Sequence, residues 1–499
     1  MIEDCRFDMS ESTQESCEGY SDLLGQGEWG TRKNKRKIFI RRIIGYKSCL
    51  KQNAIAMYTK TLRILIFYLI IFSSPTLLDL IFPRVATILE LSLIVLLWGY
   101  TWIFVRGKLN KKEQKTPDFF LILLGICSLI SVIISLFIRE IPLAVIIYRL
   151  FTYFSFYTCV YLFAYIKRKY KLFKKLLIFI VLLSNIISIG IVSDSLGILV
   201  DVPIVGQRLV KWEEKAGVLQ NKLRGGQRRG SFFIGGSTSV YPILSLGILS
   251  SVILFNLEGE KRKYLWGMIL NLSLVWLGCF FSLSRAPVLL ASAMIGYLVL
   301  RFFLLSRKSK SQRKMLIGIF CVIAIITAPI LQAKLYEKIN TKALNILSSG
   351  LSTEELANYK RYYAWYQGIL LFTDSESYIG YGLGTSNVAV KKNKLLRYDQ
   401  YNYHYESAIF STFSEGGIVG LIVILLPFFI IIFYSQKTPN RDVYIIWVFL
   451  LVINLCAAPI YGYPSQLAYF VGMSFCLATK PHKSSTRMIV MKPMVSIEH

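Results

Sequence analysis

The sequence predicts an all-α, polytopic membrane protein with about twelve transmembrane helices and a large outer loop. Of its 499 residues, 54% are hydrophobic, and the mean hydropathy of +0.50 is high for a soluble globular protein. The apolar residues lie in runs of about 18 to 25, long enough to cross roughly 30 Å of hydrocarbon as helices. Because backbone polar groups in lipid must be hydrogen-bonded within the chain, these runs are expected to be helical.

The predicted spans fall into three groups, which two outer loops separate. The spans are 62–82, 86–106, 118–138, 141–165, 173–196, 236–256, 264–282, 286–305, 315–333, 407–434, 442–460 and 464–480. The predicted organisation is 1–57, a disordered cytoplasmic tail, acidic then basic; 58–196, transmembrane helices 1–5; 197–235, a basic outer loop; 236–333, transmembrane helices 6–9; 334–405, a large aromatic outer loop; 406–480, transmembrane helices 10–12; and 481–499, a second cytoplasmic tail.

The net charge of +29 is concentrated in clusters of Lys and Arg that all fall on one side of the membrane under this arrangement. The clusters lie at 31–42, 106–115, 167–175, 260–263, 307–314 and 480–487. This pattern follows the positive-inside rule and predicts a multi-pass protein of the cytoplasmic or inner cell membrane with both termini in the cytoplasm. The clusters are interpreted as topology signals near anionic lipid, so nucleic acid is not an expected partner.

The N-terminal tail and the cysteines exclude two further classes. Residues 1–57 lack the apolar segment of a signal peptide. The nine cysteines lie in the N-terminal tail or within spans, and no CxxC or Cys/His metal spacing occurs. Neither a disulfide framework nor a metal centre is therefore predicted, and no cofactor is expected.

The basic outer loop carries an arginine pair, Arg228 and Arg229, immediately before Gly230 at the entrance to a span. Long loops can be translocated despite their charge, so these arginines do not contradict the topology. The planar guanidinium group binds phosphate through two parallel hydrogen bonds, which Lys cannot offer. The pair is a candidate diphosphate-binding site, and the alternative is simple contact with lipid phosphates.

A second candidate arginine lies in the short outer turn "FFSLSRAPVLL" (280–290). Arg285 stands at the outer end of a span, and Pro287 suits the first turn of the helix that follows. Arg285 could bind an anionic substrate group or act as an interfacial anchor.

The large outer loop is rich in aromatic residues. The stretch "NYKRYYAWYQGILLF" (358–372), which contains Arg361, is typical of an amphipathic helix at the membrane surface. The glycine-rich "IGYGLGTSN" (379–387) lacks a nucleotide-binding context and is interpreted as a turn. The aromatic side chains suit sugar rings, with an interfacial belt as the alternative. The candidate glycan-binding residues are Trp365, Tyr362 and Tyr403.

The end of this loop, "YNYHYESAIFSTFSEGGIVG" (401–420), contains His404 and Glu406, which would project to one side of an extended chain. Either could accept a proton from a sugar hydroxyl, because burial or neighbouring groups can tune its pKa. Glu415 lies inside the following span, where a charge is expected to face a partner or a cavity. Gly416 and Gly420 form a small-xxx-small pair, so together with Glu415 they are predicted to pack against another helix.

Residues from about 200 to 434 resemble the O-antigen polymerase and O-antigen ligase superfamily, multispan enzymes that act on polyprenyl-diphosphate-linked glycans. The features that carry the resemblance are "RRG" (228–230), "SLSR" (282–285), Arg361 followed by Trp365, "GYGLGT" (380–385), and the His404/Glu406 segment leading into "SEGGIVG" (414–420).

The resemblance implies a GT-C-type glycosyltransferase architecture and an oligosaccharide repeat-unit polymerase that serves O-antigen, capsule or exopolysaccharide synthesis. Its donor would be a glycan on undecaprenyl diphosphate at the outer face. Arg228, Arg229, Arg285 and Arg361 would bind the diphosphate, and Glu406 or His404 would deprotonate the acceptor, giving inversion. No Asp-x-Asp pair follows the first span, so metal-independent transfer is expected. Implied partners are the lipid-linked donor and acceptor, membrane lipids, a chain-length regulator and a flippase.

One departure favours a polymerase over a ligase. The ligases typically carry a His-Asn pair about ten residues before the glycine of their G-x-x-G ending, and Glu406-Ser407 occupies that position here. The histidine-dependent mechanism of the ligases therefore cannot be assigned directly to this sequence, although a ligase function stays an open alternative. A flippase or exporter of lipid-linked oligosaccharide is the alternative from another class. It would place cations along a central cavity, whereas these arginines cluster at outer ends.

Overall fold

The computed structural model describes residues 56–71, 81–82, 86–138, 141, 143, 146–147, 150, 161–162, 164–166, 168–203, 206–207, 209–210, 223–224, 227–228, 230, 232, 240–258, 261–305, 379–382, 407–435, 440–457 and 471–472. The predicted all-α class is confirmed for this part of the chain, where the regular structure is helical except for one hairpin of two-residue strands.

The helices are α4 (Ala86–Tyr100), α5 (Lys111–Ile133), α7 (Tyr170–Ser195), α8 (Ile198–Asp201), α11 (Val240–Leu257), α12 (Arg262–Phe281), α13 (Arg285–Leu305), α17 (Ala408–Ser435) and α18 (Arg441–Ala457). Short π-helices η2 (Thr101–Val105) and η4 (Ile134–Ile138) extend α4 and α5, and the 3-10 turn η3 (Arg106–Lys108) follows η2. Strands β1 (Leu223–Arg224) and β2 (Gln227–Arg228) pair antiparallel, with Leu223 opposite Arg228. A further helical stretch covers 56–71.

Four described helices are long and apolar enough to cross a membrane: Leu91–Lys108, Tyr170–Ser195, Val240–Leu257 and Arg262–Phe281. Ala286–Arg301 is a shorter apolar helix. The predicted spans at 236–256 and 264–282 correspond to α11 and α12. A membrane protein is therefore supported, while the total of about twelve spans and the GT-C resemblance stay predictions.

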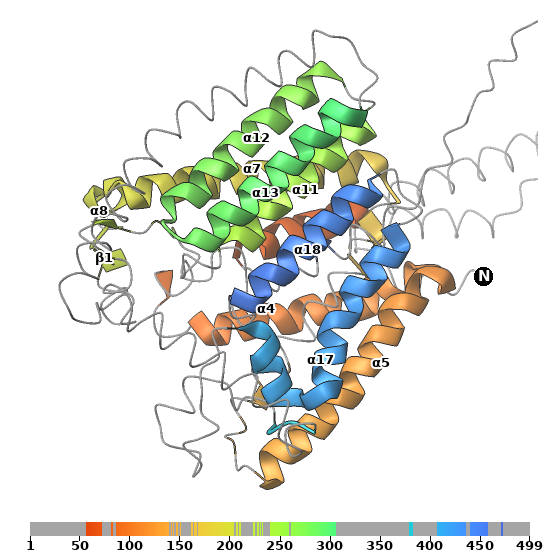
Figure 1. Ribbon diagram of the computed structural model, residues 1–499. Helices are drawn as coiled ribbons and strands as arrows, with labels where there is room; N and C mark the ends of the chain where they lie inside the picture. Colours follow the sequence, from red (N-terminus) through yellow and green to blue (C-terminus); the bar gives the residue numbers. More distant parts are fainter. Residues whose placement is uncertain are drawn as a thin grey trace, which may run out of the picture.

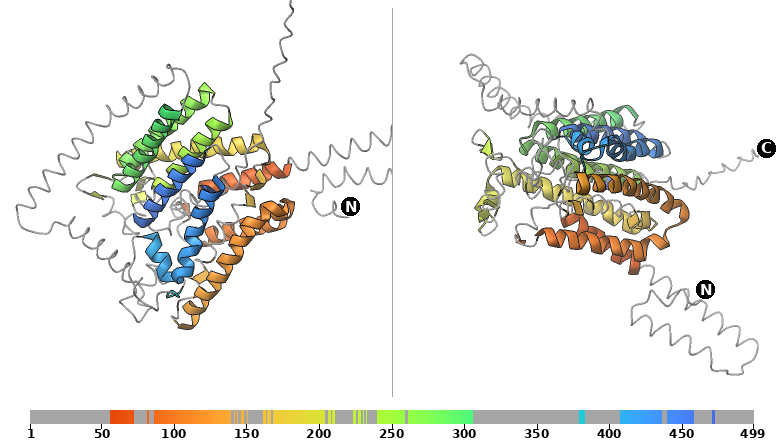
Figure 2. Two further views of the ribbon diagram at one scale, coloured as in Figure 1. Left: turned by 45° about the vertical axis from the view of Figure 1, so that its right-hand side comes forward. Right: turned by 90° about the horizontal axis from the view of Figure 1, so that it is seen from below.

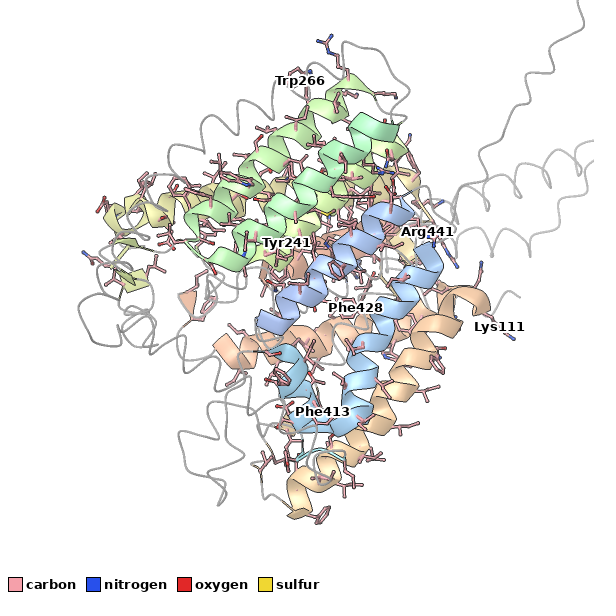
Figure 3. The ribbon with its side chains drawn as sticks, in the orientation of Figure 1. Lys111, Tyr241, Trp266, Phe413, Phe428 and Arg441 are labelled. Atoms are coloured by element: carbon pink, nitrogen blue, oxygen red, sulfur yellow. The ribbon has the colours of Figure 1, made fainter. Side chains whose placement is uncertain are left out.

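The helices alternate in direction, so the bundle has two distinct ends. At one end, which we call the basic end, α5, α7, α12 and α18 begin, as Lys111 and Arg441 illustrate in Figure 3. At the other, the loop end, α11, α13 and α17 begin. Helix α7 contacts α11, α11 contacts α12, and α17 contacts both α18 and α5. Figures 1 and 2 show α17 beside α18 and α5.

The core lies where α7, α11 and α12 meet. Every residue of α11 from Val240 to Phe255 is buried, so this helix lies at the centre of the bundle. Polar side chains join the helices inside it. Asn271 donates to Ser184 Oγ at 2.8 Å and to Asn185 Oδ1 at 2.7 Å, and Trp447 Nε1 donates to Ser245 Oγ at 3.1 Å.

Ionic groups connect neighbouring helices at the basic end. Lys174 pairs with Glu258, which also accepts a hydrogen bond from Tyr170 at 2.7 Å. Arg106 holds Asp118 through two hydrogen bonds of 2.9 and 3.2 Å. These contacts hold the helices together at the basic end. The motifs identified in the sequence lie at the loop end.

Candidate functional site

Four sequence motifs lie at the loop end of the bundle. They are the segment around Gly230, the SLSR turn (282–285), the 379–382 turn and the SEGG segment of α17 (414–417). They form two junctions. One joins Gly230 to the SLSR turn, and the other joins the 379–382 turn to α17.

At the first junction, the basic loop is hydrogen-bonded to the ends of two helices. Gly230 N donates to the carbonyl of Phe281, the last residue of α12, at 3.1 Å. Phe232 N donates to Asp194 Oδ2 at 3.0 Å, and Asp194 is fully buried in the last turn of α7. A side chain at position 230 would lie 2.1 Å from the carbonyl oxygen of Ile191, so only glycine permits this approach.

The SLSR turn is stabilised by hydrogen bonds of its own Ser282 side chain. Ser282 Oγ donates to the carbonyl of Cys279 at 2.6 Å and accepts from Ser284 N at 3.3 Å. Leu283 takes a positive φ of 51°, which is uncommon for a residue with a side chain and indicates a constrained turn. Arg285 is the first residue of α13, as the sequence predicted for the end of a span, and its side chain lies outside the described part.

The first junction brings the "RRG" segment and the SLSR turn together. Arg228 lies in β2, two residues before Gly230, and Gly230 is bonded to the residue that precedes the SLSR turn. The backbone therefore brings the "RRG" segment and the start of α13 to one place, although they are more than fifty residues apart in the sequence. Arg229 and the side chain of Arg228 lie outside the described residues.

At the second junction, α17 is broken at Gly417, where φ is 61° and ψ is −153°. Figure 3 shows Phe413 on the short segment before the break and Phe428 on the long segment after it. Two carbonyls just before the break accept hydrogen bonds from the 379–382 turn: Tyr381 N donates to Ser414 O at 2.7 Å, and Gly382 N donates to Glu415 O at 3.1 Å. A broken helix in a membrane protein requires such partners for its backbone.

The last turn of α5 and the π-helix η4 that extends it cover the same junction. Ser131 Oγ lies 3.5 Å from Glu415 O, and a side chain at position 382 would lie 2.6 Å from Ser135 Oγ. The turn predicted for 379–387 is thus seen at 379–382, enclosed between α5 and α17. Tyr381 in this turn is 1% exposed.

The predicted helix-packing residues lie at this break. Glu415 is 2% exposed, inside the short segment of α17. An alanine methyl group at Gly416 would make an ordinary contact with Ser131 Oγ at 3.7 Å, and one at Gly420 would lie 3.2 Å from the carbonyl of Thr412. The residue of this cluster whose backbone requires glycine is Gly417, which the sequence interpretation did not single out.

The other predicted site residues lie outside the described part of the chain. They are the candidate bases Glu406 and His404, the arginines Arg229 and Arg361, and the aromatic residues Trp365, Tyr362 and Tyr403. Ser407, which follows Glu406, is buried at the start of α17, and its hydroxyl lies 3.5 Å from Phe410 N. The roles proposed for these residues stay predictions.

Three buried polar side chains near the loop end have no hydrogen-bond partner within the described part of the chain: Tyr241 in the first turn of α11, Thr412 in α17 and Asn454 in the last turn of α18. Their exposed fractions are 0%, 4% and 1%. Buried polar groups normally find a partner, so each is a candidate to bind a water molecule or a ligand hydroxyl.

Sequence reasoning missed Asp194 and Ser131. Asp194 interrupts an otherwise apolar run just before the basic loop, which is a usable signal, because an acidic residue in a span is expensive without a partner. Ser131 carries no such signal. Among the described residues, no group of three His, Cys, Asp or Glu side chains could hold a metal ion, and metal-independent chemistry stays a prediction.

Comparison with known families finds one match. Residues 270–425 match the family model described as O-antigen ligase. The matched region runs from α12 to α17 and includes the SLSR turn, the 379–382 turn and the break at Gly417, but not Gly230. No curated protein and no solved structure matches the chain. The match confirms the resemblance to the O-antigen polymerase and ligase superfamily.

Proposed function

We propose that this protein, whose residues 270–425 match the family model described as O-antigen ligase, is a polysaccharide polymerase that joins lipid-linked oligosaccharide repeat units. Its donor and acceptor would both be carried on undecaprenyl diphosphate at the outer face of the cell membrane. The product would be O-antigen, capsule or exopolysaccharide. The family match itself supports a glycosyltransferase of the polymerase or ligase type acting on lipid-linked oligosaccharide.

The observation that carries the proposal is the hydrogen bond between Gly230 and Phe281, which joins the "RRG" segment to the SLSR turn. It supports a single anion-binding region in which Arg228, Arg229 and Arg285 contribute to one diphosphate. Guanidinium groups would neutralise the charge that develops on the leaving diphosphate, in place of a metal ion. Arg361 of the large outer loop would complete this region.

The acceptor half of the reaction would lie toward α17. Glu406 or His404, at the entrance to this helix, would take the proton from the acceptor hydroxyl as it attacks the anomeric carbon, and the diphosphate would leave with its electron pair. Direct displacement inverts that carbon. Trp365, Tyr362 and Tyr403 would hold sugar rings through their aromatic faces.

The positions of the charges support an enzyme over an exporter. The arginine motifs lie with the loop end of the bundle, and the core between α7, α11 and α12 is joined by neutral amide and hydroxyl side chains. An exporter would instead require cationic residues along a passage through the described bundle. A ligase remains the nearest alternative, since the matched family model carries that description.

Glycan profiling of host cells with and without this gene tests the proposal. Lipid-linked and surface-attached glycans would be separated by length. Single repeat units at the outer face in the deletion strain are expected for a polymerase. Long polymer retained on its lipid carrier would identify a ligase, and single units trapped at the cytoplasmic face would identify an exporter.

A further inference from the structure

An apolar groove lies between the helical stretch 56–71 and α4, and its lining includes none of the motif residues of the loop end. Its volume is about 450 Å³, within the range of small-molecule sites. Phe67 and Ile71 line one wall, and Leu93 and Leu96 line the other. Phe67 is 54% exposed and Leu96 is 68% exposed, so the groove opens to the outside of the bundle, and Figure 2 shows these red and orange helices at its edge.

The groove has one charged end. Arg63 lines it together with Tyr100, whose hydroxyl is 2.8 Å from Thr61 Oγ1 and so joins the two walls there. From Arg63 to Ile71 the helix rises about 12 Å, at 1.5 Å per residue. A ligand that fills the groove would place an anionic group at Arg63 and an apolar chain about half-way into the hydrocarbon.

The surroundings of Arg63 are cationic. Lys60 is exposed one turn earlier, and the Lys108 ammonium reaches Met57 of the same stretch, 2.9 Å from its sulfur. The carboxylate of Asp118, in α5, is paired with Arg106. Among the described residues, neither Lys60 nor Arg63 has an ion-pair partner, so both are available to an external anion.

We propose that this groove binds an anionic phospholipid of the leaflet at the basic end, with its phosphate on Arg63 and an acyl chain against Phe67, Leu93 and Leu96. An arginine at the membrane boundary is stabilised by a lipid phosphate, and juxtamembrane cations attract anionic lipid. The site is independent of the proposed enzymatic function. Under the positive-inside rule, that leaflet is the cytoplasmic one.

Native mass spectrometry of the full-length protein tests the site, after extraction from vesicles of phosphatidylcholine with equal amounts of phosphatidylglycerol. The wild type should retain phosphatidylglycerol preferentially. Arg63→Gln should lower that retention about fivefold, the effect of one cation near an anionic surface. Leu96→Trp should lower it by filling the groove, and because position 96 is exposed, this variant tests the groove without disturbing the core.

Arg262→Gln is the matched control, because Arg262 is an exposed arginine at the basic end on α12. It should retain lipid like the wild type. Equal retention of the two lipids by the wild type, or unchanged retention in both Arg63→Gln and Leu96→Trp, would overturn the proposal. Displacement of phosphatidylglycerol by stoichiometric undecaprenyl phosphate would also overturn it, by identifying the polyprenyl carrier as the occupant.

Discussion

Gly380 lies directly against Gly417: a side chain on Gly380 would come within 2.6 Å of the backbone nitrogen of Gly417. Both residues have positive φ, 90° and 61°. The turn at 379–382 and the break in α17 therefore fit together through two positions that tolerate only glycine. This contact joins a turn within the predicted large outer loop to the helix that follows the candidate bases.

Gly417→Ala is expected to weaken this junction, because the backbone of Gly417 occupies a region that residues with side chains reach at a cost of about 1–3 kcal/mol. The thermal unfolding midpoint in detergent should fall, and polymer formation should fall with it. Gly416→Ala is the matched control, since a methyl group there meets only Ser131 at an ordinary 3.7 Å. Equal effects of the two substitutions would contradict a specific role for the break.

Asp194→Ala is expected to release the basic loop from α7. The substitution leaves the partly buried Phe232 amide without this acceptor, at a cost of about 1–3 kcal/mol. Glycan length should shorten and limited proteolysis between α8 and α11 should accelerate. Asp201→Ala, at an exposed position at the end of α8, should change neither. Wild-type proteolysis of the Asp194 variant would remove this anchoring role.

Arg285→Ala should reduce chain extension about a hundredfold or more, the effect of losing one stabilising donor at a developing charge. Arg285→Lys should restore little, because an ammonium group lacks the planar fork of guanidinium. Arg262→Ala is the control, since Arg262 is likewise the first residue of a helix but lies at the basic end. Glycan length and protein level would be measured together. Full-length polymer in the Arg285→Ala strain, at normal protein level, would refute the diphosphate role.

The two candidate bases are distinguished by ranking their substitutions. If Glu406 takes the proton, Glu406→Gln should slow transfer about 10²- to 10⁴-fold and should be worse than His404→Ala. The reverse ranking would assign the base to His404. Tyr405→Phe, between them, is the control for local disturbance. Activity of purified protein on lipid-linked repeat units is the measurement, and residual wild-type rates in the double variant would exclude both residues.

Stability should depend on acid pH through Glu258. Hydrogen bonds from Lys174 and Tyr170 lower the pKa of this carboxyl to about 2. The unfolded value is about 4.3, so the stabilisation is complete above about pH 5 and is lost as the pH falls toward 2. The unfolding midpoint of the wild type should therefore drop between pH 5 and pH 3. Glu258→Gln and Lys174→Met should both flatten this drop, and a wild-type slope in both variants would show that other groups cause it.

The family and much of the helical framework were predictable because they depend on local patterns. Long apolar runs must be helical in lipid whatever they pack against, and the spans at 236–256 and 264–282 correspond to α11 and α12. The motifs "SLSR" and "SEGGIVG" were recognisable in isolation, and the match over residues 270–425 confirms the resemblance that they indicate.

The break at Gly417 was not predictable in the same way. The four-residue spacing of Gly416 and Gly420 predicts a continuous helix, and it gives no sign of a break at Gly417 between them. Only the approach of the 379–382 turn, which supplies hydrogen bonds to Ser414 and Glu415, shows why a helix breaks there. The role of Asp194 was unpredictable for the same reason, because its carboxylate accepts a hydrogen bond from Phe232 N, which lies far from it in the sequence.

The sequence by itself determined that the chain is a helical membrane protein, and it predicts that the basic clusters lie on one side, because hydrocarbon thickness and charge act on each segment separately. The tertiary structure alone decided which segments meet. It brings Gly230 to Phe281 and Gly380 to Gly417 across long stretches of chain, because buried backbone groups require specific partners that no local pattern names.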